Sequence, residues 1–564
     1  MSRLRLSCLR LVLSGLALAL SPEAIAQRDG LLQIGDQVSE FLLRQQTLGR
    51  LGGLALLSQP LSAYDAQRAL DSLALRAGDL SAVDRVLLAR FRGERPGPGA
   101  QAVRGWAGLY RNGQDLLSVA GEGYAFQLNP AAYLTAGRAR QTASETRPGT
   151  TTTWQNTRAV RASGHVGPVF FESRIEETQA RPVRPQIENS TAPRERVVRF
   201  LPLETGSRVE GTYDFGRAMG VVGFRSRHFE ARFGRDRNRW GAGTGSLWLS
   251  DFAPVYDQLQ LRTTVWRLQY TNLFAAMDAQ SVFPDRDRAL PRKYGAFHKL
   301  ALSVTDRLQI ELFESVIFLP DTLSGRSAYD VSFLNPVIFY HQVEKDYNFR
   351  GNLSVGAGAA WTVRPGVRPY GQVLLTEFQA RELFSSRRAW SNKWGFLLGL
   401  ALADLPVENL DVRAEVARVR PYTYSHHTDG NYTHYNDPLG FAAGQNLWDA
   451  ALFLRYRPHP QVRLALSGAY TRRGRDTEAQ NFGGDPRRSY DEDRPRDFGV
   501  RLLQGVRRDE LLLEVEGGYE LLPGLFLAAS LRFESISDEE TGLYRYVAPS
   551  ALVRWGLPFR SVRY

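Results

Sequence analysis

The chain has 564 residues, enough for several soluble domains or for one large barrel. Its only cysteine is Cys8, which excludes a disulfide-stapled scaffold and a thiolate metal site in the rest of the chain. The formal charge of +12 favours anionic partners such as lipid headgroups or acidic sugars.

The first 26 residues have the pattern of a secretory signal peptide. Three arginines flank or precede an apolar run at 11–20, and Ala24-Ile25-Ala26 is a cleavage signal, so we expect mature protein from near Gln27. The apolar run is too short to span a bilayer, which takes ~20 residues. Export argues against nucleic acid as a partner.

Residues 27–100 are predicted to form a small helical bundle followed by a linker. Apolar residues recur at helical spacing after Asp36 and stop at Gly49. Ser62 and Ser81 each precede an acidic residue three positions on, which is typical of a helix N-terminus. The proline- and glycine-rich stretch 92–101 is expected to be the linker.

From residue 101 to 564 the hydrophobic period changes to two, which predicts β-strands. Clear examples are the segments 409–419, 462–470 and 511–535. A soluble multi-domain sandwich and a transmembrane barrel both use this pattern. Strands of ten or more residues, joined alternately by tight and long connections, favour an all-β transmembrane barrel. At ~25 residues per strand with its loop, the segment gives about 18 antiparallel strands.

The C-terminal segment SALVRWGLPF alternates as a last barrel strand should, but the chain continues as RSVRY. Tyr564 then lies in the opposite register, so we expect a bulge or a short tail.

Four stretches carry a resemblance to a known family. They are GRDRNRWGAGTGSLWLSDFAPVYDQLQL (234–261), HKLALSVTDRLQIELFESVIF (298–318), FLNPVIFYHQVE (333–344) and NYTHYNDPLG (431–440). In order and spacing they resemble the Wzi-like capsule-assembly family of outer-membrane proteins. The resemblance implies an 18-stranded barrel with a helical bundle at its periplasmic end, and a lectin-like role in holding capsular or related polysaccharide.

The stretch 421–446 contains three histidines and allows several interpretations. As a metal site, His426, Asp429 and His434 would be ligands, but nothing in a long loop fixes their geometry. As a hydrolase, residues 426–430 distantly resemble the H-x-S-N-G stretch of outer-membrane phospholipases and lipid-A deacylases, with Thr428 in place of the serine nucleophile. The stretch could also be solvated surface. Its aromatic and amide side chains fit a sugar ligand best, so we predict neither metal nor cofactor.

Sidedness follows from the neighbouring connections. If the tight connections at 403–409 and 457–461 are periplasmic, the loop between the intervening strands lies outside the cell. The predicted ligand-binding residues of this loop are Tyr424, Asn431, Tyr432, His434, Tyr435, Asn436 and Asp437. His426 and His427 are taken as incidental.

A second candidate set is the arginine-rich stretch Arg235, Arg237, Arg239 and Trp240. These residues are predicted either to engage acidic sugars or to form a lumenal ladder with acids such as Asp236 and Asp251. The sequence does not assign this stretch to either side of the membrane or to the lumen.

Together these features predict an outer-membrane barrel that binds extracellular polysaccharide without catalysis, its helical head bracing the periplasmic mouth. The main alternative is a channel for sugars or anions, and an outer-membrane lipid hydrolase is the third. Expected partners are capsular polysaccharide, outer-membrane lipids, and the barrel-assembly and periplasmic chaperone machinery.

Overall fold

The computed structural model describes residues 30–52, 56–93, 115–143, 149–181, 206–209, 212–279, 292–320, 329, 331–334, 351–376, 387–435 and 437–559. The predicted signal peptide, linker residues 94–100 and Tyr564 lie outside these ranges.

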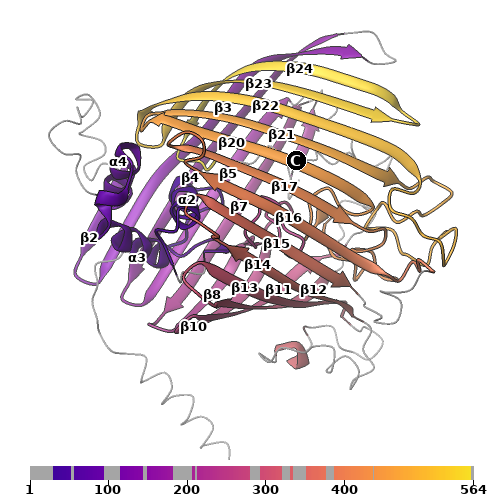
Figure 1. Ribbon diagram of the computed structural model, residues 1–564, viewed down its shortest axis with the longest axis horizontal. Helices are drawn as coiled ribbons and strands as arrows, with labels where there is room; N and C mark the ends of the chain where they lie inside the picture. Colours follow the sequence, from indigo (N-terminus) through magenta and orange to yellow (C-terminus); the bar gives the residue numbers. More distant parts are fainter. Residues whose placement is uncertain are drawn as a thin grey trace, which may run out of the picture.

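Eighteen antiparallel strands in the described ranges close into one barrel, as the sequence predicted (Figure 1). The strands are β3 (Tyr124–Ala143), β4 (Thr150–Val166), β5 (Val169–Arg181), β7 (Thr212–Arg225), β8 (Phe229–Asp236), β10 (Tyr256–Val265), β11 (Leu268–Asp278), β12 (Arg292–Ser303), β13 (Leu308–Phe318), β14 (Asn352–Trp361), β15 (Val367–Thr376), β16 (Lys393–Ala403), β17 (Leu410–Val419), β20 (Leu447–His459), β21 (Val462–Arg475), β22 (Val506–Leu522), β23 (Leu525–Asp538) and β24 (Gly542–Trp555). β24 pairs with β3 and closes the wall. Two short strands, β2 (Leu117–Gly121) and β6 (Gly206–Val209), pair at the edges of β3 and β7.

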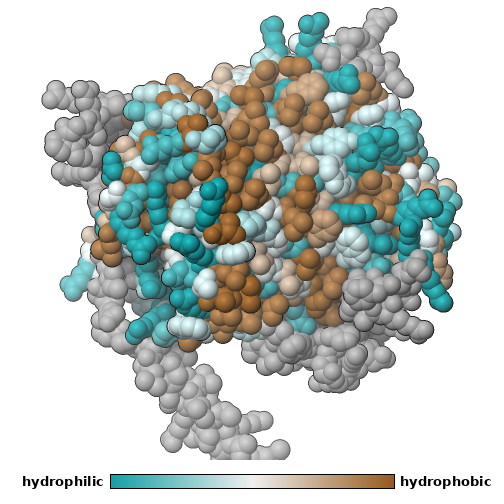
Figure 2. All heavy atoms as spheres, in the orientation of Figure 1, coloured by the Kyte–Doolittle hydropathy of each residue, from teal (hydrophilic) through white to brown (hydrophobic). Residues whose placement is uncertain are grey.

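Side chains alternate between the lumen and the outer surface of the wall. Leu398 pairs with Val416, and both are exposed, whereas the next pair, Leu397 with Ala417, is fully buried. Exposed apolar side chains of this kind form a broad zone across the middle of the barrel, with hydrophilic residues gathered toward both ends (Figure 2). An outward apolar band is what a bilayer requires of a barrel.

The last strand ends at Trp555, and the chain turns at Gly556, which has a φ of +64°. Phe559 then packs inside against Phe526, with ring centroids 5.1 Å apart. The last strand is therefore shorter than predicted, since it ends before Leu557 and Phe559, and residues 560–564, on which the choice between a bulge and a tail depends, lie outside the described residues.

The helical head consists of α2 (Gln37–Thr47), α3 (Ala63–Ala74) and α4 (Ala82–Phe91). The predicted caps are confirmed, because Ser62 Oγ accepts from Asp65 N at 3.1 Å and Ser81 Oγ accepts from Asp84 N at 3.0 Å. Leucine and phenylalanine side chains of the three helices form a shared core. None of the helices in the described part of the chain has the length and apolarity needed to cross a membrane.

The two ends of the barrel differ. Tight hairpins such as β16–β17 and β20–β21 lie at one end, here called the turn end, and the head docks there (Figure 1). The long connections, including 237–255, 420–446 and 476–505, leave from the opposite end, here called the loop end.

Candidate functional site

Residues 237–255, here called the plug loop, leave β8 at the loop end and run into the lumen before β10 begins. Their short strand β9 (Arg239–Trp240) pairs antiparallel with β1 (Ser58–Gln59) of the head. Gly241 N also donates to Leu57 O at 2.8 Å. The two ends of the barrel therefore meet inside it, which places this stretch in the lumen.

Aromatic stacking holds the plug loop against the wall. The Trp248 ring lies parallel to Phe313 with centroids 5.2 Å apart, and its indole Nε1 donates to Val373 O at 3.0 Å. The wall strand β14 carries Gly358 beneath this ring, where an added Cβ would lie 2.8 Å from Trp248 Cη2. The indole thus fills a slot that only glycine leaves open.

Polar wall residues satisfy the backbone of the plug loop. Gln372 donates to Trp240 O at 2.8 Å and accepts from Leu247 N at 3.1 Å. The Glu415 carboxylate accepts from Thr244 N at 2.6 Å and from the Tyr370 hydroxyl at 2.7 Å. Buried backbone groups need such partners, and here side chains of the barrel wall supply them.

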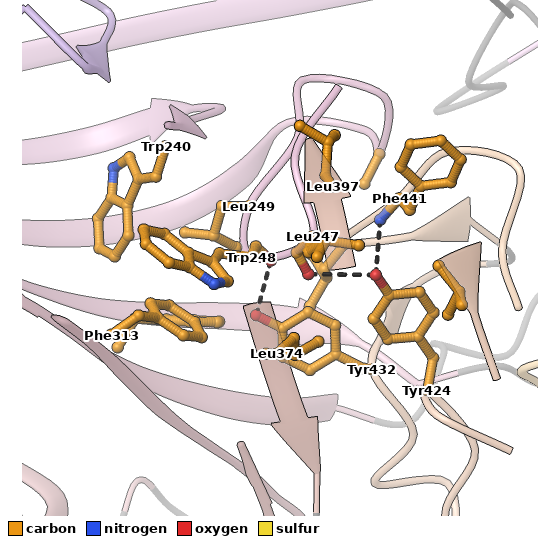
Figure 3. Packing of buried hydrophobic residues seen from close by; sticks show 14 of the residues in the cluster. Trp240, Leu247, Trp248, Leu249, Phe313, Leu374, Leu397, Tyr424, Tyr432 and Phe441 are labelled. Atoms are coloured by element: carbon orange, nitrogen blue, oxygen red, sulfur yellow. Dashed lines mark hydrogen bonds between the residues drawn. The ribbon is translucent and has the colours of Figure 1, made fainter. Parts of the chain in front are cut away.

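Residues 420–446, here called the cap loop, cover the plug loop from the loop end (Figure 3). The Tyr432 hydroxyl donates to Trp248 O at 2.8 Å, and the Tyr424 hydroxyl donates to Leu247 O at 3.1 Å. Burial raises the pKa of the Tyr424 hydroxyl, so it stays a neutral donor. Ser250 N donates to Leu439 O at 2.7 Å. The two loops therefore fold as one layered unit.

His434 is an uncharged side chain that connects two backbone segments in this unit. Its Nδ1 accepts from Asp278 N at 3.1 Å, and its Nε2 donates to Val255 O at 3.1 Å. Burial lowers the pKa of His434 to about 3. Both ring nitrogens are used by backbone groups, so His434 is not poised to hold a metal. The described residues contain no group of three or more metal-ligating side chains.

Lys293, near the start of β12, anchors the family-like stretch of the cap loop. Its Nζ donates to Asn431 Oδ1 at 2.8 Å, to Asn431 O at 3.0 Å and to Thr433 Oγ1 at 3.1 Å. Lys293 and these acceptors are buried, so Asn431 is held by a side chain of the barrel wall and does not face solvent.

The structure changes the expected position of the predicted ligand residues. Five of them are buried, with exposed fractions of 2% or less: Trp240, Tyr424, Asn431, Tyr432 and His434. In this conformation these side chains hold the two loops together and do not face solvent, contrary to the surface position expected from sequence. The half-buried members are Arg235, Arg237, Arg239, Tyr435 and Asp437, and Asn436 lies outside the described residues.

The arginines of the second candidate set lie at the rim and in the lumen. Arg235 pairs with Asp257 at 3.1 Å at the loop end of the wall. Arg237 donates to Asp251 O at 2.9 Å, and Arg239 donates to Gln59 Oε1 at 2.9 Å. Arg237 and Arg239 thus hydrogen-bond a backbone carbonyl and an amide oxygen, whereas the predicted lumenal ladder would pair them with carboxylates.

An aromatic patch on the outer surface was missed by sequence reasoning. Here it means Trp390 and His427, whose rings both contact the largely buried Tyr490, together with the exposed Phe498 of the 476–505 connection. The Trp390 and Tyr490 centroids lie 4.5 Å apart, and Arg494 Cζ is 4.2 Å from the Trp390 centroid. Trp390 N donates to Asp497 O at 2.9 Å, and Phe498, the next residue along the chain, is 53% exposed and has Arg387 Cζ 5.9 Å from its ring centroid. Only the expectation of long connections between pairs of strands hinted at this surface.

The histidine and threonine of the proposed hydrolase motif form a local turn. His426 Nδ1 and Thr428 Oγ1 are 2.9 Å apart, and Thr428 Oγ1 also accepts from Gly430 N at 3.2 Å. Such contacts between residues two apart are those of a hydroxyl-stabilised turn.

Comparison with known proteins decides the family. The family model described as capsule assembly protein Wzi matches residues 137–541. The chain belongs to the Wzi family. No curated protein sequence matches the chain.

Among solved structures, Escherichia coli Wzi has 16% sequence identity and a TM-score of 0.56, covering 94% of this chain and 99% of its own. It is described as an outer-membrane protein involved in group 1 capsule assembly and a carbohydrate-binding β-barrel. Pseudomonas aeruginosa OccK8 has 10% identity and a TM-score of 0.40 over 77% of this chain and 98% of its own. The Wzi likeness shows that the two chains share the outer-membrane barrel fold.

Proposed function

We propose that this Wzi-family protein holds an extracellular polysaccharide at the cell surface without processing it. The observation that carries the proposal is the layered unit of plug loop and cap loop, which is joined to the head by β1–β9 pairing. A barrel filled in this way is a rigid platform whose outer loops can present a binding surface. Membership of a capsule-assembly family supports the same conclusion.

The orientation we propose puts the loop end outside and the head in the periplasm. Outer-membrane barrels have short periplasmic turns and long extracellular loops, and the head docks at the turn end. The aromatic patch then faces the cell exterior.

The aromatic patch has the chemistry that a sugar requires. Sugar rings present an apolar face and a rim of hydroxyls, so their sites pair flat aromatic rings with hydrogen-bonding side chains. Trp390 and Phe498 supply the rings, and His427 and Arg494 supply polar atoms beside them. The half-buried Tyr435 and Asp437 are proposed as further contacts at the loop end.

The two alternatives fit less well. A channel for sugars or anions needs a continuous water path, and paired strands and stacked aromatics occupy the lumen where that path would run. A hydrolase needs an activated nucleophile, whereas the hydroxyl of Thr428 is part of a local turn. We therefore propose a binding role without catalysis.

The experiment is glycan-array binding of the detergent-purified chain with Trp390→Ala and Phe498→Ala. Each substitution is expected to weaken polysaccharide binding about two- to tenfold, because a stacking contact with an aromatic ring is worth about 0.5–1.5 kcal/mol. Trp266→Ala is the matched control, since Trp266 is 81% exposed at the opposite end of the barrel. Equal binding by all three variants and the wild type would remove the patch from the site, and no glycan binding by the wild type would contradict the function.

A further inference from the structure

A cavity of about 120 Å³ lies inside the barrel, beneath the plug loop, and the proposed function does not use it. Its lining includes Ser39 and Glu40 of α2, Thr244 of the plug loop, Arg413 of β17 and Ser467 of β21. A space of this size holds several waters or one small ion. The cavity lies where head, plug and wall meet.

Arginines dominate the charge around this cavity. Four of the six arginines in its lining have a carboxylate within ion-pair distance: Arg44 with Asp411 at 2.5 Å, Arg455 with Glu40 at 2.6 Å, Arg463 with Glu40 at 3.5 Å and Arg554 with Glu516 at 3.2 Å. These four are electrostatically satisfied by the protein itself.

The other two arginines, Arg239 and Arg413, contact only neutral acceptors. Arg239 donates to Gln59 Oε1 at 2.9 Å, and Arg413 donates to Ala242 O at 3.1 Å. Within the described ranges neither guanidinium has a carboxylate within 4.0 Å. The carboxylate of Glu415, two residues along β17, is already bound to Thr244 and Tyr370.

Two guanidinium groups with no carboxylate within ion-pair distance are costly beside a lumenal cavity, although Asp251, Glu415 and Glu40 attract Arg239 from farther away. Removing a charge from bulk water carries a large desolvation penalty unless an opposite charge compensates it. Like charges that line the same small space add repulsion. A mobile anion in the cavity relieves both costs, and the planar guanidinium suits carboxylate, sulfate and phosphate oxygens.

We propose that this cavity binds a small oxyanion between Arg239 of the plug loop and Arg413 of the wall. The bound oxyanion joins two elements that otherwise meet here through neutral hydrogen bonds. It therefore stabilises the plugged barrel, in the same way that any ligand specific to the folded state does.

The test is isothermal titration of the full mature chain, in non-ionic detergent and a chloride-free buffer, with sodium phosphate, sodium sulfate and sodium galacturonate in separate arms. The wild type is expected to bind at least one of them, and the tightest arm identifies the chemistry of the oxyanion. Arg239→Gln and Arg413→Gln are each expected to weaken binding at least about tenfold, the loss typical of one charge-assisted hydrogen bond. The matched control is Arg267→Gln, because Arg267 pairs with the exposed Asp306 at a tight turn.

A variant-independent measurement is a crystal soaked in selenate, where an anomalous peak between the two guanidinium groups is expected. If a glutamine variant does not fold, the presence or absence of this anomalous peak still tests the proposed oxyanion site. Flat titrations in all three arms, unchanged affinity in both folded variants, or no peak in the soaked crystal would each overturn the proposal.

Discussion

At the scale of single residues, the loops use polar side chains as internal supports. His434 bonds Asp278 N through one ring nitrogen and Val255 O through the other. Both bonds need the neutral tautomer that carries its proton on Nε2. Protonation would add a charge in a buried site and remove the acceptor that Asp278 N uses.

Stability should therefore depend on pH through His434. Its folded pKa of about 3 lies below the ordinary value of 6.5, so its contribution is complete above pH 6.5 and is lost as pH falls toward 3. In that window the unfolded chain binds the extra proton, and the free energy of unfolding should fall by up to about 1.4 kcal/mol per pH unit. Urea unfolding of the wild type and of His434→Gln at several pH values from 7 to 4 measures how the free energy of unfolding depends on pH. Parallel curves for the two proteins would contradict the prediction.

Residue-scale sequence reasoning could not separate a ligand site from a packed interior. Tyrosine, histidine and asparagine are the residues that a sugar site uses, and they are also the residues that bridge backbone groups within a folded loop. Tyr424 and Tyr432 are fully buried because Leu247 and Trp248, about 180 positions earlier, supply their acceptors. No local pattern in the cap loop signals partners that distant.

At the scale of elements, α2 is pinned to the turn end through one arginine. The Arg44 guanidinium bonds Asp84 of α4 at 3.3 Å and two residues of the β16–β17 hairpin region, Asp404 and Asp411, each at 2.5 Å. Only 9% of the Arg44 side chain is exposed. This single cation therefore joins two helices to the barrel wall.

Arg44→Gln should loosen the head. The change takes the shared counter-charge from Asp404 and Asp411, whose side chains are 21% and 31% exposed, while Asp84 keeps Arg50 at 3.4 Å, so we expect a cost of about 1–3 kcal/mol. Hydrogen–deuterium exchange of α2 and α4 amides is expected to quicken accordingly. Arg92→Gln is the control, since Arg92 pairs with the half-exposed Asp71, and such surface pairs contribute less than about 1 kcal/mol. If the α2 and α4 amides exchange at the same rate in the two variants, Arg44 does not hold the head on the barrel.

Elements were the best-predicted level of this structure. A helix start is indicated by a hydroxyl residue followed within one turn by an acidic residue, and a strand is indicated by hydrophobic residues at every second position. Both signals are therefore local in the sequence. The predicted β segment 409–419 is β17 (Leu410–Val419), and the predicted β segment 511–535 spans most of β22 and β23. The plug loop has neither signal, since Trp248 takes its position from Phe313 and Gly358 on distant strands.

At the scale of the whole molecule, the barrel should be closed to ions. The head covers the turn end, and the plug and cap loops fill the lumen from the loop end. In planar bilayers the wild type is expected to show no steady conductance. Replacing residues 241–249 by three glycines removes Leu247 and Trp248 from the core and should produce steady channels.

The matched control for that replacement is a substitution of the exposed residues 491–493 by three glycines, which should leave the barrel closed. Steady conductance of the wild type would favour the channel alternative over the platform.

The number of strands was predictable from the sequence, because it depends on chain length and on the period of the strands. The filled lumen was not predictable, because it depends on contacts between the two ends of the barrel.

The pairing of β1 with β9 also determines how the protein carries mechanical load. Main-chain hydrogen bonds link Leu57 to Gly241, Trp240 to Leu249, Ser250 to Leu439 and Leu439 to Tyr432. This series runs through the lumen from the head to the cap loop, beside the covalent chain of the wall. A force applied to the cap loop at the loop end is therefore transmitted through these hydrogen bonds to the head at the turn end.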